Sequence, residues 1–336
     1  MEWFYEFGLE MTRWLQLHYP QLEPFLQIVT ALGRFEFYLA LTPLIYWCIH
    51  KRFGKEVAYL LAITNILNAV AKHLLRQPRP LWLDANVGLD EETSYGAPSG
   101  HVQIATVIYI LVAYQVQRRR VWVLAGSAIF LMAFSRIYLG VHFWQDAVVG
   151  FLLGVCVLIG YFLWRGRFQE AFRNRILGQR ILLAVTLPLI VALIYVAGLF
   201  VIAELPQVSW IEAAEAAERV SVEEVFTAAG ILLGLGIGFI LEASRVHFTV
   251  QGPLAQRVFR YILGMIGTVI IWRGLAMVLP EDPVWLGLPL RLFRYWLAGM
   301  WVAYYAPMLF VRLGLAQATA DPDVSFSISS GGIMRE

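Results

Sequence analysis

The amino-acid sequence predicts an all-α membrane protein, a polytopic bundle of about nine transmembrane helices. Hydrophobic residues make up 59% of its 336 residues, and charged residues make up only 15%. A soluble protein averages about 25% charged residues. The apolar residues fall in blocks of about twenty, which is the length that a helix needs to cross a bilayer. Twelve tryptophans and fifteen tyrosines fit aromatic belts at the two membrane interfaces.

The chain is expected to have four parts. Residues 1–34 mix aromatic and charged side chains and are typical of an amphipathic helix at the membrane interface. Residues 35–180 hold the spans with the chemically active residues, and residues 181–315 add further transmembrane helices. Residues 316–336 are polar and rich in glycine and serine, which predicts a flexible tail.

The distribution of positive charge predicts the orientation of the spans. The predicted spans are residues 35–50, 57–75, 101–117, 121–133, 143–164, 181–203, 226–241, 261–279 and 292–311. Arginine and lysine cluster after the first, third, fifth and seventh of them. Cytoplasmic loops carry such an excess, so we expect an N-terminus outside and a C-terminus inside. The acidic stretch 212–224 is expected to form a solvated amphipathic helix.

One polar stretch, residues 135–146, stands at the junction of two apolar runs. If it is helical, His142 and Asp146 lie on one face, one turn apart. The carboxylate can then accept a hydrogen bond from one imidazole nitrogen, which leaves the other nitrogen as a nucleophile or base. Arg136 offers a fork of donors that suits phosphate. We therefore interpret this stretch as a phosphoryl-transfer centre.

Two further clusters fall at the same predicted face of the membrane. The first runs from Lys72 to Arg79 and is followed by proline, and the second is Pro98-Ser99-Gly100-His101. Lys72, Arg76, Arg79 and Arg136 are basic residues at predicted outer ends of spans. Lysine and arginine are normally enriched on the cytoplasmic side, so their presence at the outer ends indicates a bound anion there. We expect the site to face the outside of the membrane.

Together and in this order, the three clusters closely resemble the signature of the type 2 phosphatidic acid phosphatase superfamily. This superfamily includes lipid phosphate phosphatases, bacterial acid phosphatases, glucose-6-phosphatase and vanadium haloperoxidases. The resemblance implies that His142 is a nucleophile that forms a phosphohistidine, that Asp146 orients it, and that His101 is the general acid. It implies that the phosphate oxygens are held by Lys72, Arg79, Ser99, Gly100 and Arg136. Residues 35–180 are then the phosphatase core.

The resemblance leaves more than one substrate class open. The nine-span plan and residues 135–139 are similar to glucose-6-phosphatase. However, the mammalian glucose enzymes lack an acid at the position of Asp146, whereas lipid-acting members have one. We therefore expect a lipid or isoprenoid phosphate or diphosphate first and a sugar phosphate second. A lipid phosphotransferase using the same histidine pair remains open, whereas a non-catalytic relative is disfavoured because no position of the signature is missing.

The expected setting is a multi-pass integral membrane protein of the bacterial inner membrane, with its active site facing the periplasm. The expected partners are the substrate and membrane lipids, with no nucleic acid, no metal and no other cofactor, because the cations take the place of a metal. The last three spans have three open roles, which are to widen a lipid entrance, to support a homodimer or to buttress the bundle.

Other charged residues near these clusters are given lesser roles. Arg76 is undecided between a phosphate ligand and a lipid headgroup contact, and His73 is expected to be a packing neighbour. The acids of the loop 84–95 are expected to form a solvated surface over the pocket. Arg273, inside the eighth predicted span, is expected to form an ion pair or to extend to the interface.

Overall fold

The computed structural model describes residues 2–201, 205 and 207–319. Helices account for nearly all of the described structure, and the one isolated bridge given for it joins Phe248 to Ala318. The α-helices are α1 Glu2–His18, α2 Glu23–Ala31, α3 Phe35–Leu44, α4 Lys51–Leu75, α5 Pro80–Leu83, α6 Gly100–Val116, α7 Arg119–Tyr138, α8 Trp144–Arg167, α9 Gln169–Arg173, α10 Leu177–Leu199, α11 Ile211–Arg245, α12 Leu254–Val269, α13 Leu275–Val278, α14 Val284–Met300 and α15 Ala306–Arg312. Shorter helical turns are η1 Pro20–Leu22, η2 Ile45–Ile49, η3 Ala85–Val87, η4 Ile270–Gly274 and η5 Trp301–Tyr305.

Six of the described helical segments are long and apolar enough to cross a membrane, so the chain is an integral membrane protein. They are Lys51–Leu83, Arg119–Tyr138, Trp144–Arg167, Leu177–Leu199, Ile211–Arg245 and Leu254–Val278. A seventh span results if the bent helix pair Pro20–Ala31 and Phe35–Ile49 counts as one. The ninth predicted span is divided among α14, η5 and α15. The all-α class is confirmed, whereas the number nine remains a prediction.

Two sequence predictions need correction. The acidic stretch 212–224 is not a separate helix, because α11 runs unbroken from Ile211 to Arg245 and includes the seventh predicted span. The predicted tail at 316–336 lies outside the described residues from 320 onward. Its first residues are ordered, since Gln317 accepts a hydrogen bond from the backbone amide of Thr249 and Thr319 donates one to His247.

Contacts group the chain into two compact units. Unit 1 consists of Met1–Tyr38, Thr64–Leu163 and Ala197–Val225, and unit 2 consists of Leu39–Ile63, Trp164–Val196 and Phe226–Glu336. All residues of the predicted active site belong to unit 1.

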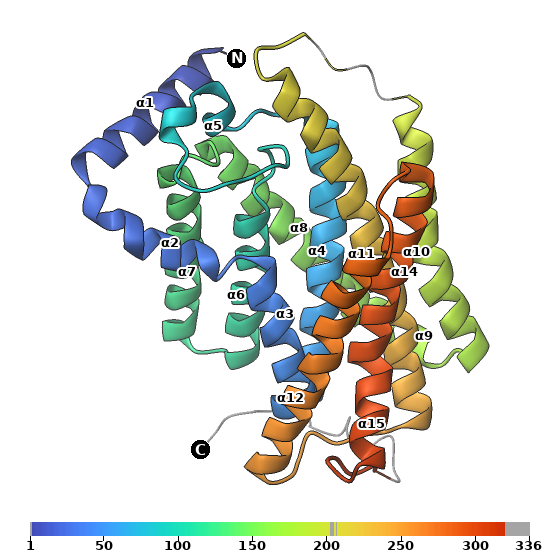
Figure 1. Ribbon diagram of the computed structural model, residues 1–336. Coiled ribbons are helices and arrows are strands. Elements are labelled where there is room, and N and C mark those ends of the chain that lie inside the picture. The colour runs from blue at the N-terminus through green and yellow to red at the C-terminus, as the bar shows by residue number, and fades with distance from the viewer. Residues whose placement is uncertain (1, 202–204, 206, 320–336) are drawn as a thin grey trace. The chain divides into compact units, whose positions relative to one another are not determined.

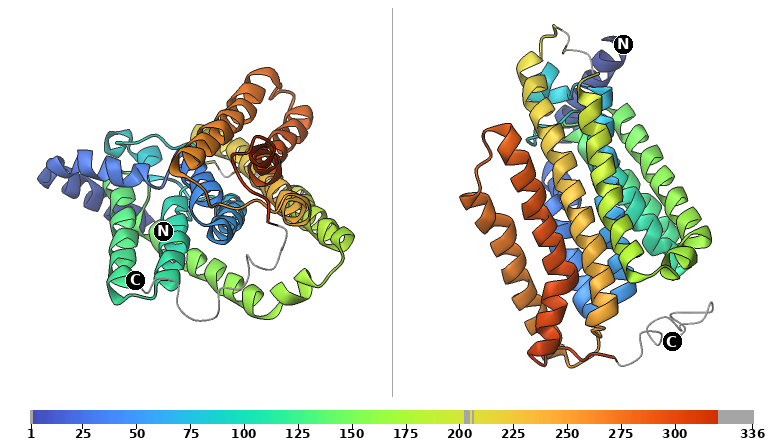
Figure 2. Two further views of the ribbon diagram at one scale, coloured as in Figure 1. Left: turned by 90° about the horizontal axis from the view of Figure 1, so that it is seen from below. Right: turned by 90° about the vertical axis from the view of Figure 1, so that its right-hand side faces the viewer.

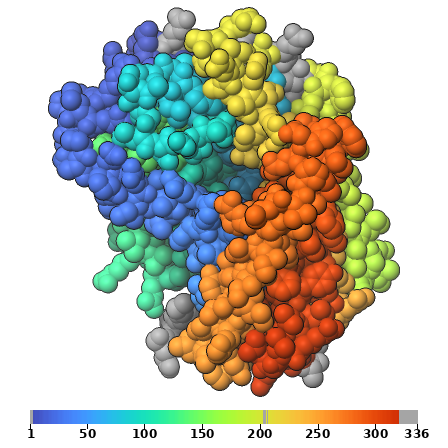
Figure 3. All heavy atoms as spheres, viewed as in Figure 1, coloured from blue at the N-terminus to red at the C-terminus, as the bar shows by residue number. Residues whose placement is uncertain are grey.

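In unit 1, α6 and α7 run side by side, and α2 packs across α7 (Figure 1). Their apolar faces enclose a core that includes Val29, Val102 and Met132. The segment around α5 lies against α1 (Figure 3). There the Arg13 guanidinium pairs with Asp84 at 2.6 Å. Gly150 of α8 allows close contact with the start of α6, because a side chain there would meet the backbone carbonyl of Ser99. This packing places the first turns of α6 and α8 together.

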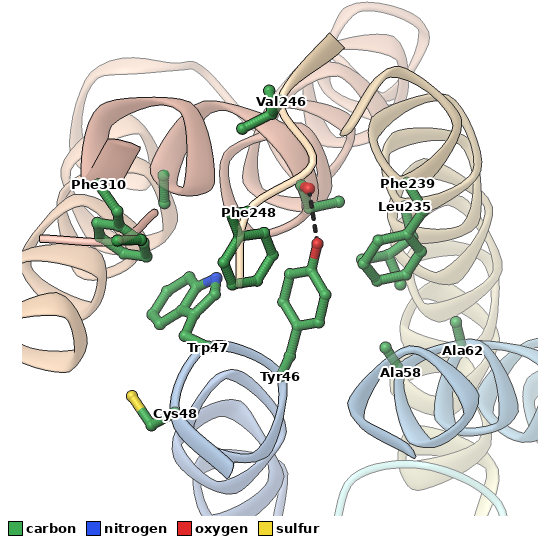
Figure 4. Close-up of a cluster of buried hydrophobic side chains, with 13 residues drawn as sticks. Tyr46, Trp47, Cys48, Ala58, Ala62, Leu235, Phe239, Val246, Phe248 and Phe310 are labelled. Carbon is green, nitrogen blue, oxygen red and sulfur yellow. Dashed lines mark hydrogen bonds between the residues drawn. The ribbon is translucent and has the colours of Figure 1, made fainter. Parts of the chain in front are cut away.

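Unit 2 has its own aromatic core, and in it α12 and the α14–α15 segment lie side by side (Figure 2). The Tyr46 hydroxyl donates to the Ala303 carbonyl at 3.1 Å (Figure 4). The Trp47 indole donates to the Val302 carbonyl at 2.9 Å. Beside this core, the buried Glu242 carboxylate pairs with Lys51 at 2.6 Å and with Lys55 at 2.8 Å. The buried Glu242 carboxylate is thus matched by two cations.

Candidate active site

The centre of the site is the turn that joins α7 to α8. His142 lies in this turn, and Asp146 lies in the first turn of α8. Both side chains are only 1% exposed. The imidazole Nδ1 of His142 lies 3.3 Å from the Asp146 carboxylate. This carboxylate also accepts a hydrogen bond from the backbone amide of Phe143 at 2.9 Å. The predicted pair is therefore formed, although His142 precedes the helix instead of lying on it.

The turn depends on Gly140, whose φ of 69° is a conformation that other residues rarely adopt. A side chain at this position would also collide with the backbone carbonyl of Val87. The same turn binds the loop that follows α4, since the Leu81 amide donates to Gly140 and the Leu89 amide donates to Leu139. These bonds hold the 80–95 segment beside His142.

The second nitrogen of His142 faces the cations. Its Nε2 lies 3.2 Å from Nη1 of Arg79. Because a guanidinium can only donate, Nε2 is the acceptor and Nδ1 carries the proton that faces Asp146. Burial lowers the pKa of His142 well below its usual value, and the charges of Arg79 and Arg136 lower it further. The imidazole is therefore neutral and has a lone pair on Nε2, as a nucleophile requires.

Three buried cations surround this histidine. Lys72 lies in the last turn of α4, Arg79 directly precedes α5, and Arg136 lies in the last turn of α7. Arg79 and Arg136 are fully buried, and Lys72 is nearly so. Each has a neutral partner, since Lys72 donates to the Ser94 hydroxyl at 2.6 Å, Arg79 to the Val141 carbonyl at 2.8 Å, and Arg136 to the Thr30 hydroxyl at 2.6 Å. Such a concentration of buried charge needs an anion.

In this structure the anion is a side chain that the sequence analysis assigned to a solvated surface. The Glu92 carboxylate pairs with Arg136 through one oxygen and with Arg79 at 3.4 Å through the other. Asp90 adds a contact of 3.2 Å to Arg136. Burial alone would raise the pKa of Glu92, but Arg79 and Arg136 hold it well below its usual range. The expectation for the loop acids is thus wrong for Glu92 and Asp90.

The first turn of α6 contributes polar atoms that have no protein partner. The Ser99 hydroxyl and Nε2 of His101 are buried without a hydrogen-bond partner among the described residues. The Ser99 backbone amide is bound to the Asp146 carbonyl at 2.9 Å, which fixes this turn to the start of α8. This bond places the first turn of α6, which carries His101, beside the first turn of α8, which carries Asp146.

Glu218, a residue that the sequence analysis did not single out, accounts for Arg76 and His73. This α11 carboxylate lies 2.8 Å from Arg76 and 2.6 Å from Nε2 of His73, and it accepts the Tyr95 hydroxyl at 2.6 Å. Arg76 is therefore bound to a protein carboxylate. The basic residues His73 and Arg76 could have suggested an acidic partner. No spacing in the sequence, however, indicates that this partner is Glu218.

Among the described residues, no group of three or more His, Cys, Asp or Glu side chains is placed to hold a metal ion. The charges that face His142 belong to lysine and arginine side chains, and these are donors and not metal ligands.

Comparison with known proteins gives two family matches. Residues 53–170 match the model described as PAP2 superfamily, and residues 226–318 match the model described as PAP2 superfamily phosphatase, transmembrane extension. The first match contains all three motif clusters.

Similar curated proteins include phosphatidylglycerophosphatase B of Bacillus subtilis, 34% identical over 119 residues, which are 33% of this chain and 55% of that protein. Glucose-6-phosphatase catalytic subunit 1 of Mus musculus is 26% identical over 206 residues, with 52% of this chain and 57% of that protein covered. The chain spans about half the length of these relatives.

A solved structure, that of the first transmembrane PAP2 type phosphatidylglycerolphosphate phosphatase from Bacillus subtilis, is 27% identical, with a TM-score of 0.42. The matched region covers 51% of this chain and 88% of the chain in that structure. Since both family models name one superfamily and the first includes the three clusters that carry the resemblance, this chain belongs to the PAP2 superfamily.

Proposed function

We propose that this protein is a membrane phosphatase that hydrolyses a lipid or isoprenoid phosphate or diphosphate through a phosphohistidine. The observation that carries the proposal is the placement of His142. Its Nδ1 faces Asp146 at 3.3 Å, and its Nε2 faces a cluster of buried cations. Phosphoryl transfer needs a positioned nucleophile and positive charge around the equatorial oxygens, and little else from the protein.

In the first step, the Nε2 lone pair of His142 attacks phosphorus as the ester P–O bond breaks. His101 gives its proton to the departing oxygen. In the second step, water attacks the phosphohistidine, His101 takes the proton of that water, and the N–P bond breaks to release inorganic phosphate. Asp146 holds the Nδ1 proton throughout and stabilises the charged imidazole.

The phosphate group is held in this proposal by Lys72, Arg79 and Arg136, together with the Ser99 hydroxyl and the Gly100 amide at the start of α6. The buried Ser99 hydroxyl supports this, because it has no partner in the described structure. Glu92 must leave both arginines before phosphate can bind them. The substrate phosphate then takes the Arg79 donor that now points at Nε2 of His142. Such a site does not require a metal.

The preferred substrate class follows from Asp146, because lipid-acting members of the family carry an acid there. Phosphatidylglycerophosphatase B, one of the similar proteins, is named for a lipid substrate, whereas another is named for glucose 6-phosphate. A sugar phosphate therefore remains the second candidate, and a lipid phosphotransferase the third. We place the site at the extracytoplasmic face of a nine-span protein with its N-terminus outside, on the basis of the charge distribution.

The test is phosphate release by purified protein in detergent with EDTA present. The substrates are phosphatidate, phosphatidylglycerophosphate, undecaprenyl diphosphate and glucose 6-phosphate, and the control is His142→Ala. Release from a lipid that EDTA does not change and that the variant lacks is the expected result. Release from glucose 6-phosphate alone would replace the first candidate by the second. Folded protein that releases phosphate from none of them would contradict a hydrolase and direct the work to phosphoryl acceptors.

A further inference from the structure

A polar cavity that contains none of the proposed active-site residues lies within unit 2. It has a volume of about 300 Å³ and is lined by Arg52, Arg165, Gln169, Glu170, Arg173 and Asn174. Arg52 lies in the first turn of α4 and Arg165 in the last turn of α8. The active-site residues on these helices, Lys72 and Asp146, lie in the opposite terminal turns. The cavity is thus a different site from the one that holds His142.

The lining of this cavity is positively charged. Three arginines and one glutamate leave an excess of two positive charges among the lining residues. Glu56, next to the cavity, lies 3.4 Å from Arg52 and reduces the local excess to one. A ligand with a single negative charge would balance the group, and a phosphodiester carries that charge. The amides of Gln169 and Asn174 add uncharged donors for its oxygens.

Arg165 has an unused donor at this place. Its Nη1 is buried and has no hydrogen-bond partner among the described residues. The nearest ion-pair partner given for it is the Glu56 carboxylate, at 4.0 Å, which is beyond hydrogen-bond distance. A buried guanidinium nitrogen without an acceptor is costly, and a ligand oxygen in the cavity would relieve that cost.

Aromatic side chains place the cavity at the level of lipid headgroups. Trp164 and Phe168 are 44% and 55% exposed, although they adjoin the arginines in the chain. Their rings stack with centroids 6.0 Å apart, and Phe172 packs against Trp164 at 5.9 Å. Exposed aromatic residues of this kind are typical of the membrane–water interface. A lipid is therefore a better occupant than a soluble phosphate ion.

We propose that the cavity lined by Arg52, Arg165 and Arg173 binds the phosphodiester headgroup of an anionic phospholipid. The phosphate oxygens accept hydrogen bonds from Arg165 and its two neighbours, and the acyl chains extend past Trp164 and Phe168 into the bilayer. Arginine forks suit phosphate better than lysine would. The site needs no chemistry from the active centre, so its occupancy does not depend on the proposed phosphatase reaction.

The test counts lipids bound to the full-length, delipidated protein in detergent by native mass spectrometry. Phosphatidylglycerol is the probe, and phosphatidylcholine is the zwitterionic comparison. The pocket variant is Arg52→Gln, Arg165→Gln, Arg173→Gln. The matched control is Arg118→Gln, Arg119→Gln, Arg120→Gln, which removes the same charge from exposed residues at the start of α7. Thermal unfolding shows that each variant is folded.

The expected result is that the pocket variant loses one tightly bound phosphatidylglycerol per chain, with affinity reduced about tenfold or more. The control variant keeps it. Equal losses in both variants would show a general surface attraction and overturn the proposal. Equal binding of phosphatidylcholine to the wild-type pocket would overturn it too. Displacement of the lipid by inorganic phosphate at equal concentration would assign the site to a soluble ion and overturn the lipid assignment.

If the pocket variant does not fold, Arg165→Lys replaces it. This variant keeps the charge and loses the fork of donors, so it should weaken phosphatidylglycerol binding by a smaller factor. An unchanged affinity in this variant would contradict the role given to the Arg165 guanidinium.

Discussion

Both units hold a carboxylate between two cations, but the surroundings of the two carboxylates differ. In unit 2, Glu242 is fully buried, and its oxygens are bound by Lys51, Lys55 and the backbone amide of Phe248. In unit 1, Glu92 lies between Arg79 and Arg136 on a loop, and buried polar atoms of Ser99 and His101 have no described partner. The first arrangement is complete, whereas the second has donors to spare.

We interpret this difference as that between a structural ion cluster and the proposed phosphate site. A cluster whose donors and acceptors are matched gains nothing from a ligand, and breaking it leaves uncompensated charge. A cluster with spare donors on rigid helices, and with its acid on a loop, can exchange that acid for a phosphate group. Substitutions at the two clusters and the pH dependence of activity test that distinction.

Removal of the nucleophile should have the largest effect. In the proposed mechanism, His142→Ala eliminates the atom that attacks phosphorus, so phosphate release should fall by about 10⁴-fold or more. Asp146→Asn keeps the shape but loses the charge that orients the imidazole, and its loss should be smaller. Steady-state rates on the best substrate measure both effects. An alanine variant that retained a tenth of the wild-type rate would show that His142 is not the nucleophile.

Neutralising the acid of the structural cluster should lower stability. Glu242→Gln leaves two lysines without a counter-charge, at a cost of about 2–4 kcal/mol in the free energy of unfolding. Both lysines are partly exposed, which keeps the cost below that of a fully buried pair. Unfolding in detergent, followed by intrinsic fluorescence, measures the loss. Activity per folded molecule should be unchanged, and a selective loss of activity would remove the distinction between the two clusters.

The matched change at the other cluster should affect binding more than stability. Glu92→Gln weakens the hold of the loop on Arg79 and Arg136, so phosphate should compete less against the protein's own carboxylate. Inhibition by vanadate or inorganic phosphate should become about three- to tenfold tighter. The inhibition constant measures this effect. Weaker inhibition in the variant would mean that Glu92 positions the arginines for phosphate.

The shift of the acidic limb of the pH–activity profile should be the smallest of the four effects. Burial and the neighbouring cations lower the pKa of His142 below its ordinary value of about 6.5. As pH falls, the imidazole stays neutral until the pH drops below that lowered pKa, so the nucleophile persists in acid. The acidic limb of kcat/KM should therefore lie below about pH 6.5. A limb above this pH would contradict the assigned environment of His142.

The sequence could predict which site residues lie together where a local pattern ties them to one another. His142 and Asp146 are four residues apart, and their contact forms even though only Asp146 is helical. The all-α class followed from apolar blocks long enough to span a bilayer. What these features share is that composition or short spacing determines them.

The features that the sequence could not predict are contacts between distant segments. Glu92 and Glu218 were placed on solvated surfaces because acids usually are. Their partners, Arg136 and Arg76, are 44 and 142 residues away. The continuity of α11 was missed as well, because its acidic first half lacks the apolar signal that identified the other spans. Burial of an acid can be recognised only when the packing around it is known.

The central claim is that His142 carries the phosphoryl group during turnover. Rapid acid-free quenching of the protein with a substrate labelled in its phosphorus, followed by peptide mapping, tests it directly. A label that is stable in base, labile in acid, located on His142 and absent from His142→Ala is the expected result. A label on another residue, or turnover of wild-type protein with no protein-bound label at any quench time, would contradict the account.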